Sequence, residues 1–252
     1  MREGQRVKAK AKTALITGAA KRVGAVTAKK LHSNGYNVVI HYGQSASEAE
    51  QLVNALNEKR KNSAVAIQAD LSDLSAVSKL SKAAVAQWGG MHALINNASA
   101  FYPTPLNEST IKQWDELFNS NAKAPYFLAQ SLAGTLAESE GAIVNMVDIH
   151  ATHPLKHYNL YGMSKAALAF MTKSLAKDLA PHVRVNGIAP GMVMWPDEEI
   201  HELDREKLLR RIPLKKSGTP DDIANAIAFL VEQPYITGQI LAIDGGRSLM
   251  VG

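Results

Sequence analysis

Tyr161 and Lys165 are the two residues of this chain whose types and spacing are best suited to moving a proton. They lie four residues apart in a helical run, YGMSKAAL, so both side chains share one face of a helix, one turn apart. A phenol with a pKa of about 10 is a poor acid or base at neutral pH, and a nearby ammonium group favours the phenolate and lowers that pKa. The pair therefore predicts a proton donor for hydride transfer to a C=O or C=N bond.

Seven apolar runs rich in β-formers alternate with helical patterns and must position this pair. The runs cover 13–17, 37–42, 64–68, 93–96, 142–147, 184–188 and 239–243. Strands of this kind, separated by helices, are typical of a parallel sheet that is covered on both faces. The sequence therefore predicts an α/β fold: a single-domain, Rossmann-like, doubly wound parallel sheet of about seven strands with helices on both faces.

Composition and charge exclude several classes of protein. The chain has no cysteine, which excludes disulfides, cysteine-ligated zinc, iron–sulfur clusters and a thiol nucleophile. The net charge is +5, and the first twelve residues hold five Lys or Arg against one Glu. We interpret residues 1–11 as a basic, poorly ordered tail and residues 12–252 as one domain. No apolar run approaches the roughly 20 residues of a membrane span, so we expect a cytoplasmic protein without a membrane or nucleic-acid partner.

The stretch TGAAKRVG, which follows the first expected strand, is suited to binding a pyrophosphate. Gly18 permits a tight turn, and the helix that begins near Val23 offers free N–H groups and a positive dipole to an anion. Lys21 and Arg22 place two cations in the same turn, although cations oppose the dipole at a helix N-terminus. We interpret them as ligands of an anionic group; the alternative is a pair of solvated first-turn cations.

The end of the second expected strand indicates which dinucleotide is bound. An acidic residue there typically holds the ribose 2′-hydroxyl of NAD. The residues at this place, His41, Tyr42, Gln44 and Ser45, include no carboxylate. A carboxylate would repel a 2′-phosphate, which carries roughly −1.5 to −2 charges near neutral pH. The sequence therefore predicts NADPH as the cofactor.

The stretch 189–218 interrupts the alternation of strands and helices after the sixth strand. In open α/β sheets the ligand lies outside the carboxyl ends of the strands, so we expect residues 190–217 to form a substrate lid. Met192 and Trp195 would then contact the substrate, because they are costly apolar residues to leave on a loop. An ordinary surface insertion is the alternative. His150, His153 and His157 do not predict a metal site, because Pro154 breaks the helix between them.

With these pieces in place, the chain resembles the short-chain dehydrogenase/reductase family over about residues 12–249. The matching pieces are Thr17-Gly18…Gly24, Asp70-Leu71, the NNA run at 96–98, Asn121, Tyr161-x-x-x-Lys165, Pro190-Gly191 and IDGG at 243–246. The resemblance implies that Tyr161 is the acid, that Lys165 also holds the nicotinamide ribose and that Asn121 supports a proton-relay water. It also implies that Asp70, Leu71, Asn97, Ala98, Ser99, Pro190 and Gly191 contact the cofactor, and that the protein is a homotetramer.

Two departures from the family pattern are shared with the pteridine reductases. Arg22 stands where the family usually has glycine, and Asp148, thirteen residues before Tyr161, stands where it usually has a serine. The runs TGAAKRVG, HYGQSASEAE and NNASAFYPTPL are also similar to segments of that branch. The resemblance implies a pterin or folate substrate stacked between the nicotinamide and Phe101, with Ser99 and Arg22 bonded to its polar edge.

The catalytic residues expected from this resemblance are Asp148, Tyr161 and Lys165. A hydride would pass to a C=N carbon of the pterin, and a proton would arrive through Asp148, Tyr161 and water. The alternative is a carbonyl reductase of the same family, such as a 3-oxoacyl carrier-protein reductase. Arg247 lies near, but not at, the place of a C-terminal arginine that in relatives reaches a neighbouring subunit.

Overall fold

The computed structural model describes residues 11–193 and 202–250, and its centre is one parallel sheet of seven strands. The strands are β1 (Thr13–Ile16), β2 (Asn37–Tyr42), β3 (Ala64–Gln68), β4 (Ala93–Asn96), β5 (Ala142–Met146), β6 (Arg184–Pro190) and β7 (Ile240–Ile243). Their order in the sheet is β3-β2-β1-β4-β5-β6-β7, and every neighbouring pair is parallel. The predicted doubly wound fold is therefore confirmed.

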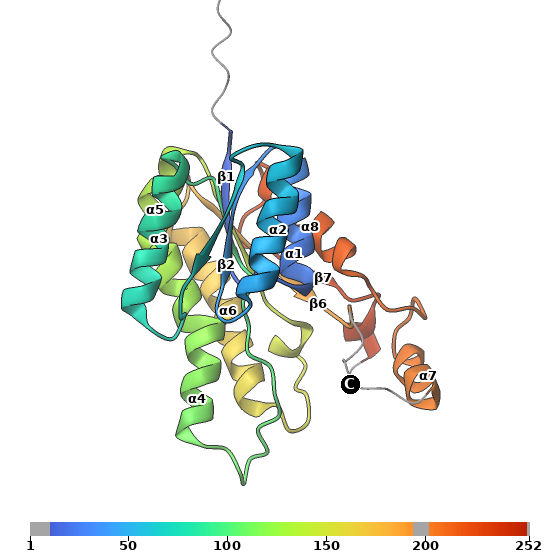
Figure 1. Cartoon of the computed structure of the whole chain (residues 1–252). Helices are drawn as coiled ribbons and strands as arrows, with labels where there is room; N and C mark the ends of the chain where they lie inside the picture. The colour runs from blue at the N-terminus through green and yellow to red at the C-terminus, as the bar shows by residue number, and fades with distance from the viewer. Residues whose placement is uncertain (1–10, 194–201, 251–252) are drawn as a thin grey trace, which may run out of the picture.

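Helices cover both faces of this sheet (Figure 1). They are α1 (Arg22–Ser33), α2 (Ala46–Lys59), α3 (Leu74–Trp88), α4 (Ile111–Phe118), α5 (Ala124–Glu138), α6 (Asn159–Asp178), α7 (Glu202–Arg210) and α8 (Pro220–Glu232). The apolar faces of α1, α2 and α8 pack in one core, and those of α3, α5 and α6 pack in a second core on the opposite face. Because both faces are covered, the strands β1 and β4 are buried along their whole length.

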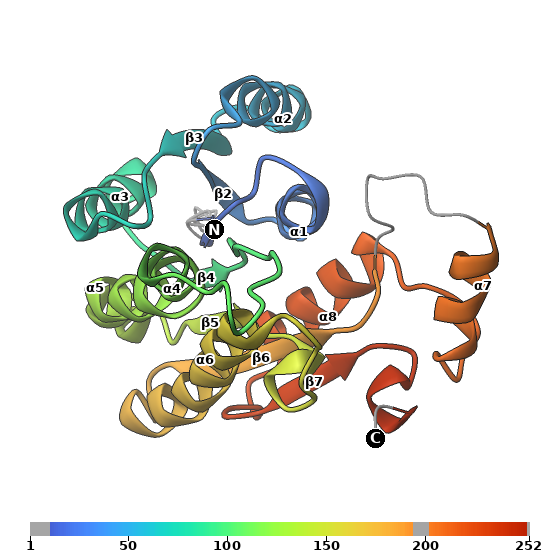
Figure 2. The ribbon, with the colours of Figure 1, turned by 90° about the horizontal axis from the view of Figure 1, so that it is seen from below.

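The order of the strands places a crevice at the carboxyl ends of β1 and β4. The chain leaves β1 toward β2 and leaves β4 toward β5, so the connecting segments diverge on opposite sides of this point. Seen along the strands from their carboxyl ends, the loops after β1, β4 and β5 surround this central point, and α7 lies to one side of it (Figure 2). Such a reversal of strand order is where open α/β sheets bind their ligands.

The turn between β1 and α1 is held by close backbone packing. Gly18 has a φ of 60°, which glycine adopts without a steric cost, and its N–H donates to Nδ1 of His41 at 3.1 Å. A Cβ added at Gly24 would lie 2.5 Å from the carbonyl oxygen of Gly18 and 2.6 Å from Nδ2 of Asn97. Glycine at position 24 is therefore required by the approach of α1 to the turn and to β4.

We expect Gly24→Ala to destabilise the protein by about 1–3 kcal/mol, because the new methyl group must displace backbone atoms. The matched control is Gly90→Ala, whose Cβ would meet only the ring of His92 at 3.7 Å. Urea unfolding followed by circular dichroism measures both changes. Equal stability of the two variants would show that the turn relaxes around the added methyl group.

Candidate active site

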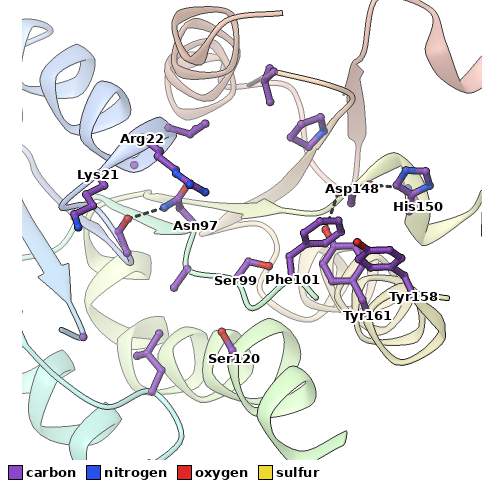
Figure 3. Close-up of a pocket in the computed structure, with 18 of the residues that line it drawn as sticks. Lys21, Arg22, Asn97, Ser99, Phe101, Ser120, Asp148, His150, Tyr158 and Tyr161 are labelled. Carbon is purple, nitrogen blue, oxygen red and sulfur yellow. Dashed lines mark hydrogen bonds between the residues drawn. The ribbon is translucent and has the colours of Figure 1, made fainter. Parts of the chain in front are cut away.

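A cleft of about 1090 Å³ opens at the carboxyl edge of the sheet (Figure 3). Most of the residues predicted for the site line it: Gly18, Lys21, Arg22, Val23, His41, Gln44, Asp70, Leu71, Asn97, Ala98, Ser99, Phe101, Asp148, Tyr161, Pro190, Gly191 and Met192. Tyr42, Ser45 and Lys165 are not among the residues that line the cleft; Lys165 is fully buried. Trp195 lies outside the described residues. Residues far apart in the sequence thus meet in one cavity.

His41 supports the turn between β1 and α1 and does not serve as an acid. Its ring is 2% exposed, and burial lowers its pKa, so the imidazole is neutral. Nδ1 accepts from the N–H of Gly18 at 3.1 Å, which leaves Nε2 to donate to the carbonyl of Ala69 at 3.1 Å. The histidine therefore fixes the turn after β1 to the end of β3.

The two cations of the turn differ in their surroundings. Nζ of Lys21 forms an ion pair with Oε1 of Glu48 at 2.6 Å, and both side chains are about half exposed. The hydrogen bond from Lys21 lowers the pKa of Glu48. Arg22 has a φ of 50°, a left-handed conformation that is uncommon for residues other than glycine. This explains why glycine is usual at the position, and it shows that the chain keeps arginine there at a cost in backbone strain.

Asn121 joins the loop after β4 to helix α6. It lies in a π-helical turn, Asn119–Lys123, which separates α4 from α5 and is a common irregularity at functional sites. Its Oδ1 accepts from the N–H of Ala100 and from the hydroxyl of Ser99, and its Nδ2 donates to the carbonyl of Ala100 and to the hydroxyl of Ser164. The side chain therefore positions Ser99 at the edge of the cleft.

Tyr161 and Asp148 form the central polar contact of the site. The hydroxyl of Tyr161 donates to Oδ2 of Asp148 at 2.7 Å, and Oδ1 of Asp148 accepts from the N–H of His150 at 2.8 Å. Burial raises the pKa of Tyr161 above its ordinary value, and the charge and hydrogen bond of Asp148 raise it further. The expected lowering of this pKa by Lys165 is therefore wrong: the aspartate and the burial dominate, and Tyr161 stays protonated.

Lys165 lies behind the tyrosine and is 1% exposed. Its Nζ donates to the carbonyl oxygen of Met146 at 2.7 Å, at the end of β5, and lies 5.7 Å from the centre of the Tyr161 ring. Burial lowers the pKa of Lys165 to about 8, while the charge of Asp148 acts in the opposite direction. The ammonium group therefore bonds to the main chain beneath the cleft, and the charge of Asp148 acts on its pKa.

An aromatic wall stands beside these groups. Phe101 is 55% exposed and stacks on Tyr158 at a centroid distance of 4.7 Å, while its edge meets Tyr161 at the same distance and an interplanar angle of 80°. The loops that carry Phe101 and Tyr158 are joined by a β-bridge between Thr104 and Tyr158. A flat heterocycle is a suitable ligand for such a wall, because aromatic faces stack with an offset.

Sequence reasoning missed Tyr158 and Arg247, and both line the cleft. Tyr158 lies three residues before Tyr161, a spacing that could have been recognised as one helical face. Arg247 comes from the segment after β7 and had no comparable signal. Leu208 of α7 also lines the cleft. The lid expected in 190–217 stays a prediction, and 194–201 lie outside the described residues.

The described residues contain neither a metal-binding cluster nor a membrane-spanning helix. Among the described residues, no group of three or more His, Cys, Asp or Glu side chains is arranged to hold a metal ion. Within the same residues, no helix combines the length and the apolar character that crossing a bilayer requires.

Comparison with known proteins agrees with the fold. The family model described as enoyl-(acyl carrier protein) reductase matches residues 18–248. Pteridine reductase 1 of Leishmania tarentolae is 40% identical over 95% of this chain and 97% of its own length. The 3-oxoacyl-(acyl-carrier-protein) reductase FabG of Staphylococcus aureus is 34% identical over 93% of this chain and 97% of its own, and 3beta-hydroxysteroid dehydrogenase 1 of Eggerthella lenta is 32% identical over 96% of each.

The chain therefore belongs to the short-chain dehydrogenase/reductase family and is an oxidoreductase. Membership implies a nicotinamide dinucleotide as the cofactor. Within the family, the match over nearly its whole length places it in the pteridine reductase branch.

The lowered pKa of Lys165 predicts a specific pH dependence of stability. Its pKa of about 8 in the folded protein lies below the ordinary value of 10.5, so the unfolded chain binds more protons between these values. The free energy of unfolding, measured relative to Lys165→Met, should therefore rise by about 3 kcal/mol as the pH rises from 8 to 10.5, and should be flat below pH 8.

Urea unfolding at a series of pH values measures this difference. The control is Lys173→Met, which removes an exposed lysine from the same helix and should follow the wild-type profile. A constant difference between the wild type and Lys165→Met across the range would contradict the buried-ammonium interpretation.

Proposed function

We propose that this protein reduces pterins with NADPH, taking dihydropterins or dihydrofolate to the tetrahydro form, with oxidised pterins as further candidate substrates. The observation that carries the proposal is the 2.7 Å hydrogen bond from Tyr161 to Asp148, next to the exposed ring of Phe101. An aspartate in this place can bind a substrate rich in N–H groups, because a carboxylate accepts hydrogen bonds. The 40% identity to a pteridine reductase of Leishmania tarentolae supports the same assignment.

The phosphate end of the cleft fits NADPH. The end of β2 continues as Gly43 and Gln44 without a carboxylate, and Lys21 and Arg22 line the cleft from the turn after β1. The N-terminus of α1, where Lys21 forms no side-chain cap, lies at this end of the cleft and is suited to a pyrophosphate. When it is bound, the nicotinamide supplies a hydride to a C=N carbon of the pterin.

The residues of this chain would supply the matching proton to the ring nitrogen. Tyr161 is held protonated, and its hydroxyl is directed at Asp148 rather than at open space. We infer that Asp148 faces the substrate and passes on a proton that it draws from Tyr161 and water. The charge of Asp148 favours the ammonium form of Lys165, which lies behind Tyr161.

We also propose that the protein acts as a homotetramer. Helices α4, α5 and α6 expose a group of large apolar side chains: Ile111, Trp114, Tyr126, Met163 and Phe170. Trp114, Tyr126 and Phe170 line a groove between these helices. Exposed apolar patches of this kind are typical of surfaces that pack against another protein, and a second copy of this chain presents a matching surface.

The direct test of the proposed activity is NADPH oxidation by the purified protein with dihydrobiopterin or dihydrofolate. Asp148→Asn should lower kcat at least about a hundredfold, because the amide cannot carry the proton. Its Oδ1 can still accept from the N–H of His150, so the fold should be kept. Asp221→Asn, an exposed change on α8, is the control. Inertness toward every pterin, with turnover of an acetoacetyl thioester, would favour a carbonyl reductase instead.

The ion pair between Lys21 and Glu48 predicts how cofactor preference can be changed. We expect Glu48→Gln to tighten NADPH binding by about threefold, because Lys21 is released to meet the 2′-phosphate, and to leave NADH binding unchanged. The gain should shrink at high salt. Fluorescence titration of both cofactors measures the effect, with Glu50→Gln as the control. Equal changes in the affinity for NADH and for NADPH would show that Lys21 does not contact the 2′-phosphate.

A further inference from the structure

A turn after β7 holds Arg247 in a fixed place at the edge of the cleft. It begins the short 3-10 helix Arg247–Met250, and its N–H donates to the carbonyl of Asp244 at 3.1 Å. The carboxylate of Asp244 accepts from the N–H groups of Gly246 and Ser248 at 2.8 and 2.7 Å. Its oxygens are therefore engaged by backbone rather than by the arginine.

This turn packs against the segment that follows α7. The N–H of Leu214 donates to the carbonyl of Gly245 at 3.1 Å. A Cβ at Gly245 would lie 2.8 Å from the side chain of Ile212, and one at Gly246 would lie 2.9 Å from that of Pro213. The position of Arg247 is thus coupled to the segment that carries Leu208, and Figure 2 shows the C-terminal turn near α7, beyond β7.

Arg247 is a positively charged residue of the cleft. In the part of the chain that the structure describes, its guanidinium pairs with no acidic side chain. No carboxylate in 11–193 or 202–250 forms an ion pair with it. The apolar side chains of Met192, Val193 and Leu208 line the same cleft. An apolar wall that ends in a cation is suited to an apolar chain that ends in an anion.

The strand order separates this cation from the phosphate turn. Lys21 and Arg22 follow β1, Asp148 follows β5 and Arg247 follows β7, and β5 lies between β1 and β7 in the sheet. The proton-transfer residues therefore lie between two positive regions. Since the cofactor phosphates belong to the region after β1, the region after β7 faces the part of the substrate that lies away from the cofactor.

We propose that Arg247, beside Met192, Val193 and Leu208, forms a subsite for a carboxylate at the end of an apolar side chain of the substrate. The inference rests on the proposed pterin reduction and narrows it: pterins whose aryl tail ends in carboxylates, as the glutamyl group of dihydrofolate does, are selected over pterins with a neutral tail. Arg247 contributes to binding and takes no part in proton transfer. The sequence showed only that this arginine lies near the C-terminus, whereas the structure places it in the cleft of its own chain.

The test compares two substrates that share the pterin ring, dihydrofolate with its carboxylates and dihydrobiopterin with a neutral tail. For Arg247→Met we expect kcat/KM for dihydrofolate to fall about tenfold through a higher KM, with kcat unchanged. The constants for dihydrobiopterin should stay within twofold of the wild type. Arg247→Lys should recover part of the loss, and high salt should reduce the difference between the wild type and Arg247→Met.

Arg211→Met is the matched control, because it removes an exposed arginine just beyond α7 that does not line the cleft. An equal loss on both substrates, or an equal loss in Arg211→Met, would overturn the subsite. A wild-type enzyme that reduces dihydrobiopterin but not dihydrofolate would also overturn it and would leave the proposed function standing. A wild-type enzyme that reduces neither would remove the proposed function itself.

Discussion

The parallel pairing of β1 with β4, and of β4 with β5, brings every functional group of this protein to one edge of the sheet. Thr17 shows how this pairing continues into the loops: its hydroxyl accepts from the N–H groups of Asn97 and Ala98, directly beyond the last paired residues. The side chain of Asn97 in turn donates to the carbonyls of Thr17 and Gly18. The phosphate turn and the loop after β4 are therefore parts of one hydrogen-bonded structure, which the strand pairing positions.

Three ionisable groups lie close together at the cleft: Tyr161 and Lys165 are buried, and Asp148 is partly exposed. The hydroxyl of Tyr161 donates to Asp148, and Nζ of Lys165 lies 5.7 Å from the centre of the Tyr161 ring and donates to the carbonyl of Met146. The carboxylate raises the pKa of Tyr161, and the same charge favours the protonated form of Lys165 against the effect of burial. Such coupled groups titrate together, so a change at any one of the three alters the other two.

The sequence predicted the sheet and its strands because uninterrupted apolar runs are a direct consequence of burial on both faces. The family spacing also led us to expect Asp148, Tyr161 and Lys165 in one site, and the structure brings these three residues together. The direction of the Tyr161 pKa was not predictable, because helical spacing places Lys165 one turn away but does not show that its amine turns to the carbonyl of Met146. The pairing of Lys21 with Glu48 and the place of Arg247 also depend on tertiary contacts that no local pattern encodes.

The bridge between Thr104 and Tyr158 has a consequence for motion in the aromatic wall. The N–H of Thr104 donates to the carbonyl of His157, so the loop after β4 and the loop before α6 are held by main-chain contacts as well as by stacked rings. Neither loop can swing outward without breaking these bonds. The two segments should therefore exchange their amide hydrogens as one cooperative unit, and a ligand that reaches only one of them would slow exchange in both.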